Sequence, residues 1–211
     1  MSTTKGQRIG ISIIAVVMVV GTVLGFFVMM LSTDNQVRDN EKRQKTLSEY
    51  QQKYAEYQQK TQKQADELSK KYYPEFKKYA KYPKKFNIDS VKKVKSKDLV
   101  KGSGKTIGDD TKYHAYYIGW NPDGKVFDQS IMGDKLRSPL DASIGLIEGW
   151  GEGVKGMKIG GIRLIEIPSD KAYGEKGSGK DIPPNTPIKF IVMAIESPEE
   201  IEAPELPNLG Q

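Results

Sequence analysis

The chain contains no cysteine and only one histidine, His114. Without thiols it can form no disulfide, and it offers neither a thiolate ligand for zinc nor a cysteine nucleophile. A histidine-based triad would have to use His114, whose neighbours alternate as in a strand, so we expect a surface or half-buried strand position instead. One imidazole also leaves almost no ligands for a transition metal, and we expect neither a metal nor a cofactor.

Charged residues are missing from Ile9–Leu31, a stretch of mainly Ile, Val, Leu, Phe, Met and Gly. As a helix this stretch would be roughly 35 Å long, enough to cross the hydrocarbon core of a bilayer. It predicts a transmembrane anchor after a short tail at residues 1–8. A cleaved signal peptide is the alternative, and Met29–Thr33 is a poor cleavage site. We therefore predict a single-pass membrane protein whose C-terminal domain is extracytoplasmic.

Glycine and proline are missing from Lys42–Tyr73, which predicts a helix within a polar spacer at residues 32–86. The least polar side chains follow a 3-4 alternation that could form a coiled coil: Leu47, Tyr50, Tyr54, Tyr57, Thr61, Gln64 and Leu68. Tyr, Thr and Gln make a weak seam, so a single solvated helix is favoured. A homodimer through the anchor and spacer is the alternative, because Gly21 and Gly25 form a GxxxG pattern.

Charge is distributed unevenly, with lysines crowded between Lys70 and Lys97 and glutamates crowded in the tail at residues 198–211. The tail also carries prolines, and we expect it to be disordered. The basic region could attract an anionic polymer or lipid, which is one alternative role for the spacer. No recognition helix or ribonucleoprotein motif accompanies it, so no nucleic acid is expected as a partner.

Short apolar runs separated by Gly, Pro, Asn and Asp occupy residues 87–197. The runs Asp89–Val94, Tyr113–Ile118, Arg163–Ile167 and Ile188–Ile195 predict strands. The one plausible helix in this region is short and glycine-rich, at Ile147–Met157. This pattern predicts an α+β domain built on an antiparallel sheet.

Five motifs occur in order within this region: Tyr116–Gly119, Gly124–Asp128, Leu146–Trp150, Ala172–Gly174 and Ile182–Thr186. Together they resemble the FKBP-type peptidyl-prolyl cis-trans isomerases. The resemblance implies a bent antiparallel sheet wrapped around one short helix, with an apolar pocket that accepts a proline ring. The anchor and the spacer lie outside it.

The resemblance also implies which residues form the site. The catalytic positions are Tyr117, Phe127, Asp128, Ile147, Trp150 and Tyr173. The substrate-binding positions are Leu140, Leu146, Ile182 and Phe190. Arg137 is the expected partner of Asp128.

Three features depart from the family pattern. About three residues are missing before Leu146, Leu140 stands where phenylalanine is frequent, and the loop Glu175–Asp181 carries Ser178 but no aromatic residue or histidine. We predict a prolyl isomerase that binds the twisted X-Pro amide and assists folding of exported or membrane-proximal proteins. The alternative is a tethered, non-catalytic peptide-binding or chaperone module, which the shortened loop favours.

Overall fold

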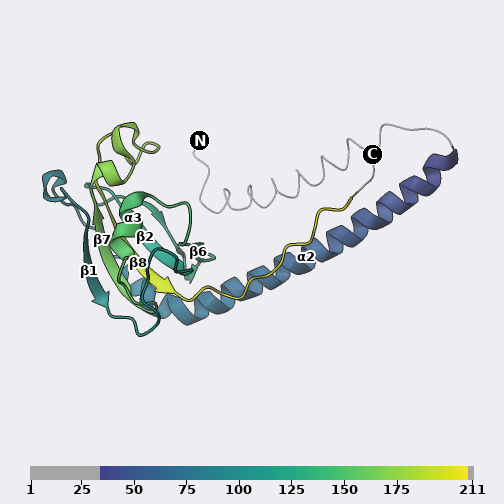
Figure 1. Cartoon of the computed structure of the whole chain (residues 1–211), viewed down its shortest axis with the longest axis horizontal. Helices are drawn as coiled ribbons and strands as arrows, with labels where there is room; N and C mark the ends of the chain where they lie inside the picture. Colours follow the sequence, from purple (N-terminus) through teal and green to yellow (C-terminus); the bar gives the residue numbers. More distant parts are fainter. Residues whose placement is uncertain (1–33, 209–211) are drawn as a thin grey trace. The chain divides into compact units, whose positions relative to one another are not determined.

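The computed structural model describes residues 34–208 (Figure 1). Residues 56–203 form one compact unit. The described part of a second unit comprises residues 34–55 and 204–208. Everything that follows about the site concerns residues 56–203.

An antiparallel sheet is the centre of the larger unit, with strands in the order β1-β7-β8-β2-β3. Strand β6 pairs with His114 and Ala115, the first two residues of β2. A separate short hairpin joins β4 to β5. The strands are β1 (Lys95–Val100), β2 (His114–Trp120), β3 (Val126–Gln129), β4 (Ile131–Met132), β5 (Lys135–Leu136), β6 (Leu140–Asp141), β7 (Ile162–Ile167) and β8 (Ile188–Ile195).

Among residues 34–208 the helices are one long and one short α-helix and several single turns of 3-10 helix. The α-helices are α2 (Asp34–Phe76) and α3 (Glu148–Val154), and the 3-10 turns are η1 (Lys77–Tyr79), η2 (Ile88–Ser90), η3 (Ser169–Lys171) and η4 (Gly174–Lys176). Figure 1 shows α3 lying against the sheet near β7 and β8. The predicted antiparallel sheet with one short helix is confirmed.

Three of the four strands predicted from the sequence are found, and one is not. The strands expected at Tyr113–Ile118, Arg163–Ile167 and Ile188–Ile195 correspond to β2, β7 and β8. The strand expected at Asp89–Val94 is wrong: a 3-10 turn occupies Ile88–Ser90, where the Asn87 side chain accepts a hydrogen bond from the Asp89 N–H, and β1 begins only at Lys95. Asparagine favours such turns because its side chain competes with the strand ladder.

Strand β8 is buried on both faces, and this explains why its sequence is apolar almost throughout. Phe190, Val192 and Ala194 point into the core that α3 completes. Ile191 and Met193 alternate with them and belong to a second core on the opposite face of the sheet. A sheet with two apolar faces needs a cover on each.

The C-terminal part of α2 supplies the second cover. Phe76 is fully buried, and its ring lies 6.3 Å from the ring of Tyr116 on β2. The Ser69 hydroxyl accepts a hydrogen bond from the backbone N–H of Leu136 at 2.8 Å, and the Tyr73 hydroxyl donates one to the carbonyl of Gly133. This end of the helix therefore packs on the domain and is not simply solvated, although its residues are mostly polar.

The predicted membrane topology needs correction. Among residues 34–208, no helix is both long and apolar enough to cross a bilayer. The long helix α2 is built largely of Lys, Glu, Gln and Tyr, and polar and charged side chains of this kind are costly in hydrocarbon. The prediction of a single-pass membrane protein is contradicted on this finding, and the stretch Ile9–Leu31 on which it rested lies outside the described residues.

Candidate active site

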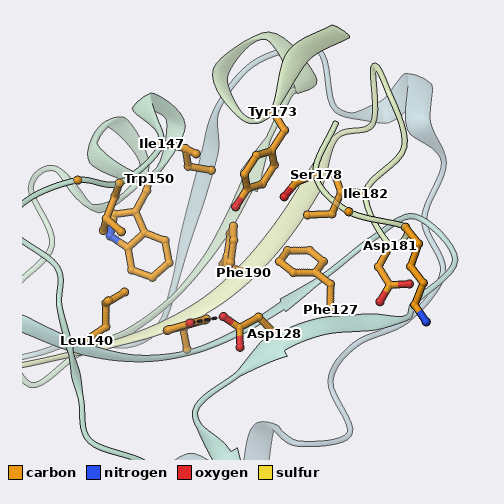
Figure 2. A pocket seen from close by; sticks show the side chains of 15 residues that line it. Phe127, Asp128, Leu140, Ile147, Trp150, Tyr173, Ser178, Asp181, Ile182 and Phe190 are labelled. Carbon is orange, nitrogen blue, oxygen red and sulfur yellow. Dashed lines mark hydrogen bonds between the residues drawn. The ribbon is translucent and has the colours of Figure 1, made fainter. Parts of the chain in front are cut away.

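A pocket of about 560 Å³ opens between α3, the inner face of the sheet and the loop at residues 178–182 (Figure 2). Every residue that the sequence predicts for the site lines it: Tyr117, Phe127, Asp128, Leu140, Leu146, Ile147, Trp150, Tyr173, Ile182 and Phe190. These residues come from four strands, a helix and three loops. The chemical role of each stays a prediction.

Aromatic rings form the floor and walls of the pocket. The rings of Trp150 and Phe190 lie 5.2 Å apart at 72°, and Phe190 meets Phe127 at 5.6 Å and 87°. Tyr117 contacts Trp150 edge-on at 5.8 Å. Edge-to-face contacts of this kind are the favourable arrangement for aromatic quadrupoles, so the rings hold one another in place.

Trp150 is held by a hydrogen bond at the polar edge of its indole. Its Nε1–H donates to the hydroxyl oxygen of Tyr113 at 3.0 Å, deep in the core. The side chain is only 3% exposed, so the flat apolar face of the indole is the part it presents to the pocket. Such a surface is suited to an apolar ring.

A polar corner lies beside the aromatic rings. The hydroxyl of Tyr117 donates a hydrogen bond to the carboxylate of Asp128, and the Arg137 guanidinium donates to Asp128 Oδ1 at 3.0 Å and to the Tyr117 hydroxyl. The guanidinium also lies 5.1 Å from the centre of the Tyr117 ring. The expected pairing of Arg137 with Asp128 is thus confirmed.

The tyrosines of the pocket remain protonated at neutral pH. Burial raises the pKa of Tyr117, and its hydrogen bond to Asp128 raises that pKa further. Burial also raises the pKa of Tyr173, with a smaller effect from the negative charge of Asp128. Both phenols are therefore hydrogen-bond donors and not bases.

Two donors remain available for a ligand. Figure 2 shows Tyr173 entering from the side opposite the strands, with its hydroxyl turned towards the aromatic floor. Ile147 precedes α3 in an extended conformation, and among residues 34–208 nothing accepts a hydrogen bond from its backbone N–H. Both groups can donate to a carbonyl oxygen in the pocket.

Sequence reasoning missed Ser130, which holds the strand that carries Tyr117. Its hydroxyl accepts a hydrogen bond from the Tyr117 N–H at 2.9 Å, and its own N–H donates to the Tyr117 carbonyl at 2.8 Å. The side chain is 1% exposed. A lone serine between two strands gives no sequence signal of such a role, because most serines are exposed.

The far side of the pocket was also incompletely predicted. Ser178, Gly179, Lys180 and Asp181 line it together with Ile182. Asn121 donates to the Asp181 carbonyl at 2.9 Å, and Lys125 forms an ion pair with the Asp181 carboxylate. These contacts tie the loop to the turn between β2 and β3, so the shape of the pocket depends on residues distant in sequence.

His114 occupies the half-buried strand position that the sequence predicts. Its Nδ1 lies 3.2 Å from the Ser197 hydroxyl, and it takes no part in the pocket. Among residues 34–208 no cluster of His, Cys, Asp or Glu could hold a metal ion. The side chains that line the pocket offer a shaped apolar surface and hydrogen-bond donors.

Comparisons with known proteins agree with this geometry. The family model for the FKBP-type peptidyl-prolyl cis-trans isomerase matches residues 103–195. An FK506-binding protein of Neisseria meningitidis serogroup A is 40% identical over 98 residues, which are 45% of this chain and 87% of that protein. A probable FKBP-type peptidyl-prolyl cis-trans isomerase of Haemophilus influenzae is 36% identical over 165 residues, covering 76% of this chain and 65% of that protein.

Other relatives are much longer. The FK506-binding protein 4 of Dictyostelium discoideum is 44% identical over 98 residues, but this chain spans only 26% of its length. The shared part is thus a module that occurs in proteins of different size. On the match to nearly the whole Neisseria protein and on the family model, the chain belongs to the FKBP-type peptidyl-prolyl cis-trans isomerases.

Proposed function

We propose that the protein speeds the folding of polypeptides whose slow step is rotation about an X-Pro bond, and that the rotation takes place in the pocket described above. The observation that carries the proposal is the meeting of an apolar aromatic floor with two uncommitted donors, the Tyr173 hydroxyl and the Ile147 N–H. Uncatalysed isomerisation takes tens of seconds or more, long enough to limit folding.

The physical basis is differential binding of the twisted amide. Resonance gives the planar amide its charge separation and a rotation barrier of roughly 18–20 kcal/mol. An amide twisted halfway has lost that resonance, so it suffers less when water is removed. A dry aromatic pocket therefore binds the twisted form more strongly than the planar forms, and that difference lowers the barrier.

The aromatic and hydrogen-bonding residues of the pocket have distinct places in this scheme. The proline ring lies on the indole of Trp150, between Phe127 and Phe190. The Ile147 N–H and the Tyr173 hydroxyl bind substrate carbonyls. Asp128, fixed by Arg137, holds Tyr117 and places a negative charge beside the twisted bond.

The test uses the full chain and a short proline peptide whose cis-to-trans relaxation is followed by fluorescence. We expect acceleration by the wild type and a loss of about five- to thirtyfold in kcat/KM for Tyr173→Phe and Asp128→Ala, since each removes a hydrogen bond worth about 1–2 kcal/mol. The matched control is Asp134→Ala, at an exposed turn outside the pocket. Equal rates in all the folded variants would remove the assigned roles.

One observation favours a second candidate, a peptide-binding module without turnover. The shortened loop before α3 leaves Ile144 outside the pocket and 72% exposed, beside Gly145 and Leu146 at the rim. An exposed apolar side chain at this place can help to bind a peptide, but it adds nothing to the catalysis of rotation about an X-Pro bond. Tight binding of the proline peptide without acceleration would favour this candidate.

The homodimer through the anchor and the spacer also stays a prediction, and α2 lies in the spacer. Its tyrosine stripe includes Tyr50 and Tyr54, whose rings stack on each other at 6.0 Å within one helix. Sedimentation of the full chain over a hundredfold concentration range tests it, and a constant monomer mass would remove it.

A further inference from the structure

A second hollow of about 490 Å³ lies on the face of the sheet opposite the active site. Trp120 and Leu164 form its base, and both belong to the core on that outer face. Its sides come from the segment that follows α2, including Tyr82, Lys84 and Phe86. No part of it is shared with the proline pocket.

The walls of this hollow combine aromatic surface with fixed backbone. The Tyr82 ring meets Trp120 edge-on at 6.2 Å and is 37% exposed. The Trp120 Nε1–H donates to the Lys84 carbonyl at 3.2 Å, and the Phe86 N–H donates to the Pro122 carbonyl at 2.9 Å. The segment is therefore pinned to β2 and its turn, and the hollow does not depend on a loose loop.

The fit at Gly124 shows how closely the segment lies against the sheet. A Cβ atom at this glycine would be 2.9 Å from the backbone nitrogen of Lys85. The φ angle of Gly124, +79°, also disfavours any other residue at this position. The lysines on this segment are consequently presented from a backbone of defined position.

Five lysines line the hollow, and two of them are paired with acidic residues. Lys78 pairs with Glu75, and Lys189 pairs with Glu166 while its ammonium lies 4.5 Å from the centre of the Phe86 ring. Lys81, Lys84 and Lys85 are exposed and have no acidic partner among residues 34–208. Within the same part of the chain, no carboxylate lines the hollow.

We propose that this hollow is a binding site for an acidic peptide segment, with an apolar side chain of the peptide seated against Tyr82, Phe86 and Leu164 and its carboxylates reaching Lys81, Lys84 and Lys85. Ammonium groups at the ends of flexible stems suit scattered single carboxylates. The aromatic side chains that line the hollow add an apolar contact, which attraction between charges alone does not provide.

Other anions fit the same charges less well. A nucleic-acid strand stacks successive bases on several open aromatic faces, whereas here Trp120 is 2% exposed and Lys189 lies over Phe86, which leaves Tyr82 alone. A bilayer surface favours apolar side chains that protrude between basic ones, but here they line a concavity. A peptide can enter a concavity of this size with a single side chain.

The test measures the fluorescence anisotropy of a labelled pentapeptide, four glutamates around a central leucine, as the full chain is added. It is done at low salt and at about 0.15 M salt, where interactions between charges are largely screened beyond roughly 8 Å. A peptide with glutamines in place of the glutamates shows the contribution of charge. Lys81→Gln/Lys84→Gln/Lys85→Gln is compared with Lys101→Gln/Lys105→Gln/Lys158→Gln, which removes the same charge from exposed sites elsewhere.

We expect the first triple variant to weaken binding at least tenfold and the control triple to change it less than twofold. Tyr82→Ala should weaken binding severalfold, and proline isomerisation of a neutral peptide should be unchanged in all three variants. Equal weakening by both triples would reduce the effect to net charge and overturn the site. Lysine-dependent binding of inorganic polyphosphate or of vesicles rich in anionic lipid, with none of the peptide, would overturn the proposed occupant.

Discussion

The indole Nε1–H of Trp150 donates its hydrogen bond to the hydroxyl of Tyr113, so the floor of the pocket is anchored by a residue that does not line it. Tyr113→Phe removes the acceptor and leaves a buried N–H unpaired. We expect the free energy of unfolding to fall by about 1–3 kcal/mol. Catalytic efficiency should fall as well, because the indole is then free to tilt. Urea denaturation and the peptide isomerisation assay measure the two effects.

The matched control for that substitution is Tyr116→Phe, which lies three residues further along the chain, in β2, and belongs to the core on the opposite face of the sheet. The Tyr116 hydroxyl is buried and has no hydrogen-bond partner among residues 34–208, and burial raises its pKa. Its removal should leave stability unchanged or raise it by about 1 kcal/mol, since an unsatisfied polar group is lost. Equal destabilisation by both changes would contradict the role given to Tyr113.

Most of the site could be predicted from the sequence because its motifs lie on regular strands or beside them. Phe127 and Asp128 follow the glycine of a turn, and Trp150 lies in the one short helix, so order along the chain was enough to group them. Ser130 and Asn121 could not be found in this way. Each acts through a hydrogen bond to a backbone group, which many polar residues can make, and only the folded chain shows which carbonyl or N–H is near.

The cover on the outer face was missed for a different reason. The residues around Phe76 in α2 are mostly polar, and the apolar residues that dock are separated by turns of helix. A better signal was present in β8, where Ile191 and Met193 alternate with the residues of the inner core. An antiparallel strand that is apolar on both faces requires a layer on each, and the preceding helix was the available segment.

Docking of α2 predicts how a shortened protein behaves. A fragment of residues 86–197 lacks Phe76 and exposes Tyr116 and Ile118, whereas a fragment of residues 56–203 retains the compact unit. We expect the shorter fragment to unfold at a much lower urea concentration. Phe76→Ala in the longer fragment should cost about 3–5 kcal/mol, the usual range for a fully buried phenylalanine. Equal midpoints for the two fragments would show that α2 adds no stability.

The pH dependence of the free energy of unfolding should include a contribution from the titration of His114, the single histidine. Burial lowers the pKa of His114, and the nearby Asp141 only partly opposes that effect. Because its folded-state pKa lies below the unfolded value near 6.5, the unfolded chain binds more protons as the pH falls from about 7.5, and stability decreases. The loss is complete below the folded-state pKa.

The corresponding measurement is urea unfolding of wild type and His114→Gln at intervals between pH 7.5 and 5. The wild type should lose stability over this range, and the variant should lose less. Hydrogen bonds from Ser143 lower the pKa of the Asp141 carboxyl. The contribution of this carboxyl to stability is therefore lost only at more acidic pH. Parallel curves for the two proteins would show that His114 does not titrate differently on folding.

Gly119 provides the sharpest test of the aromatic walls. It lies on β2 between Phe127 and Phe190, and a Cβ atom at this position would be 2.5 Å from Phe190 Cε1 and 2.7 Å from the Phe127 ring. Gly119→Ala must therefore push apart two rings that line the pocket. We expect a loss of about 1–3 kcal/mol in stability, the usual cost of overpacking, and a fall of tenfold or more in kcat/KM.

Gly151→Ala, in α3, is the control, because a Cβ atom there meets nothing within 4 Å. In a helix this change should stabilise by roughly 0.5–1 kcal/mol and leave activity unchanged. If Gly119→Ala folds and isomerises like Gly151→Ala, the rings of Phe127 and Phe190 tolerate displacement. The reaction would then depend on the donors Tyr173 and Ile147 more than on the shape of the aromatic floor.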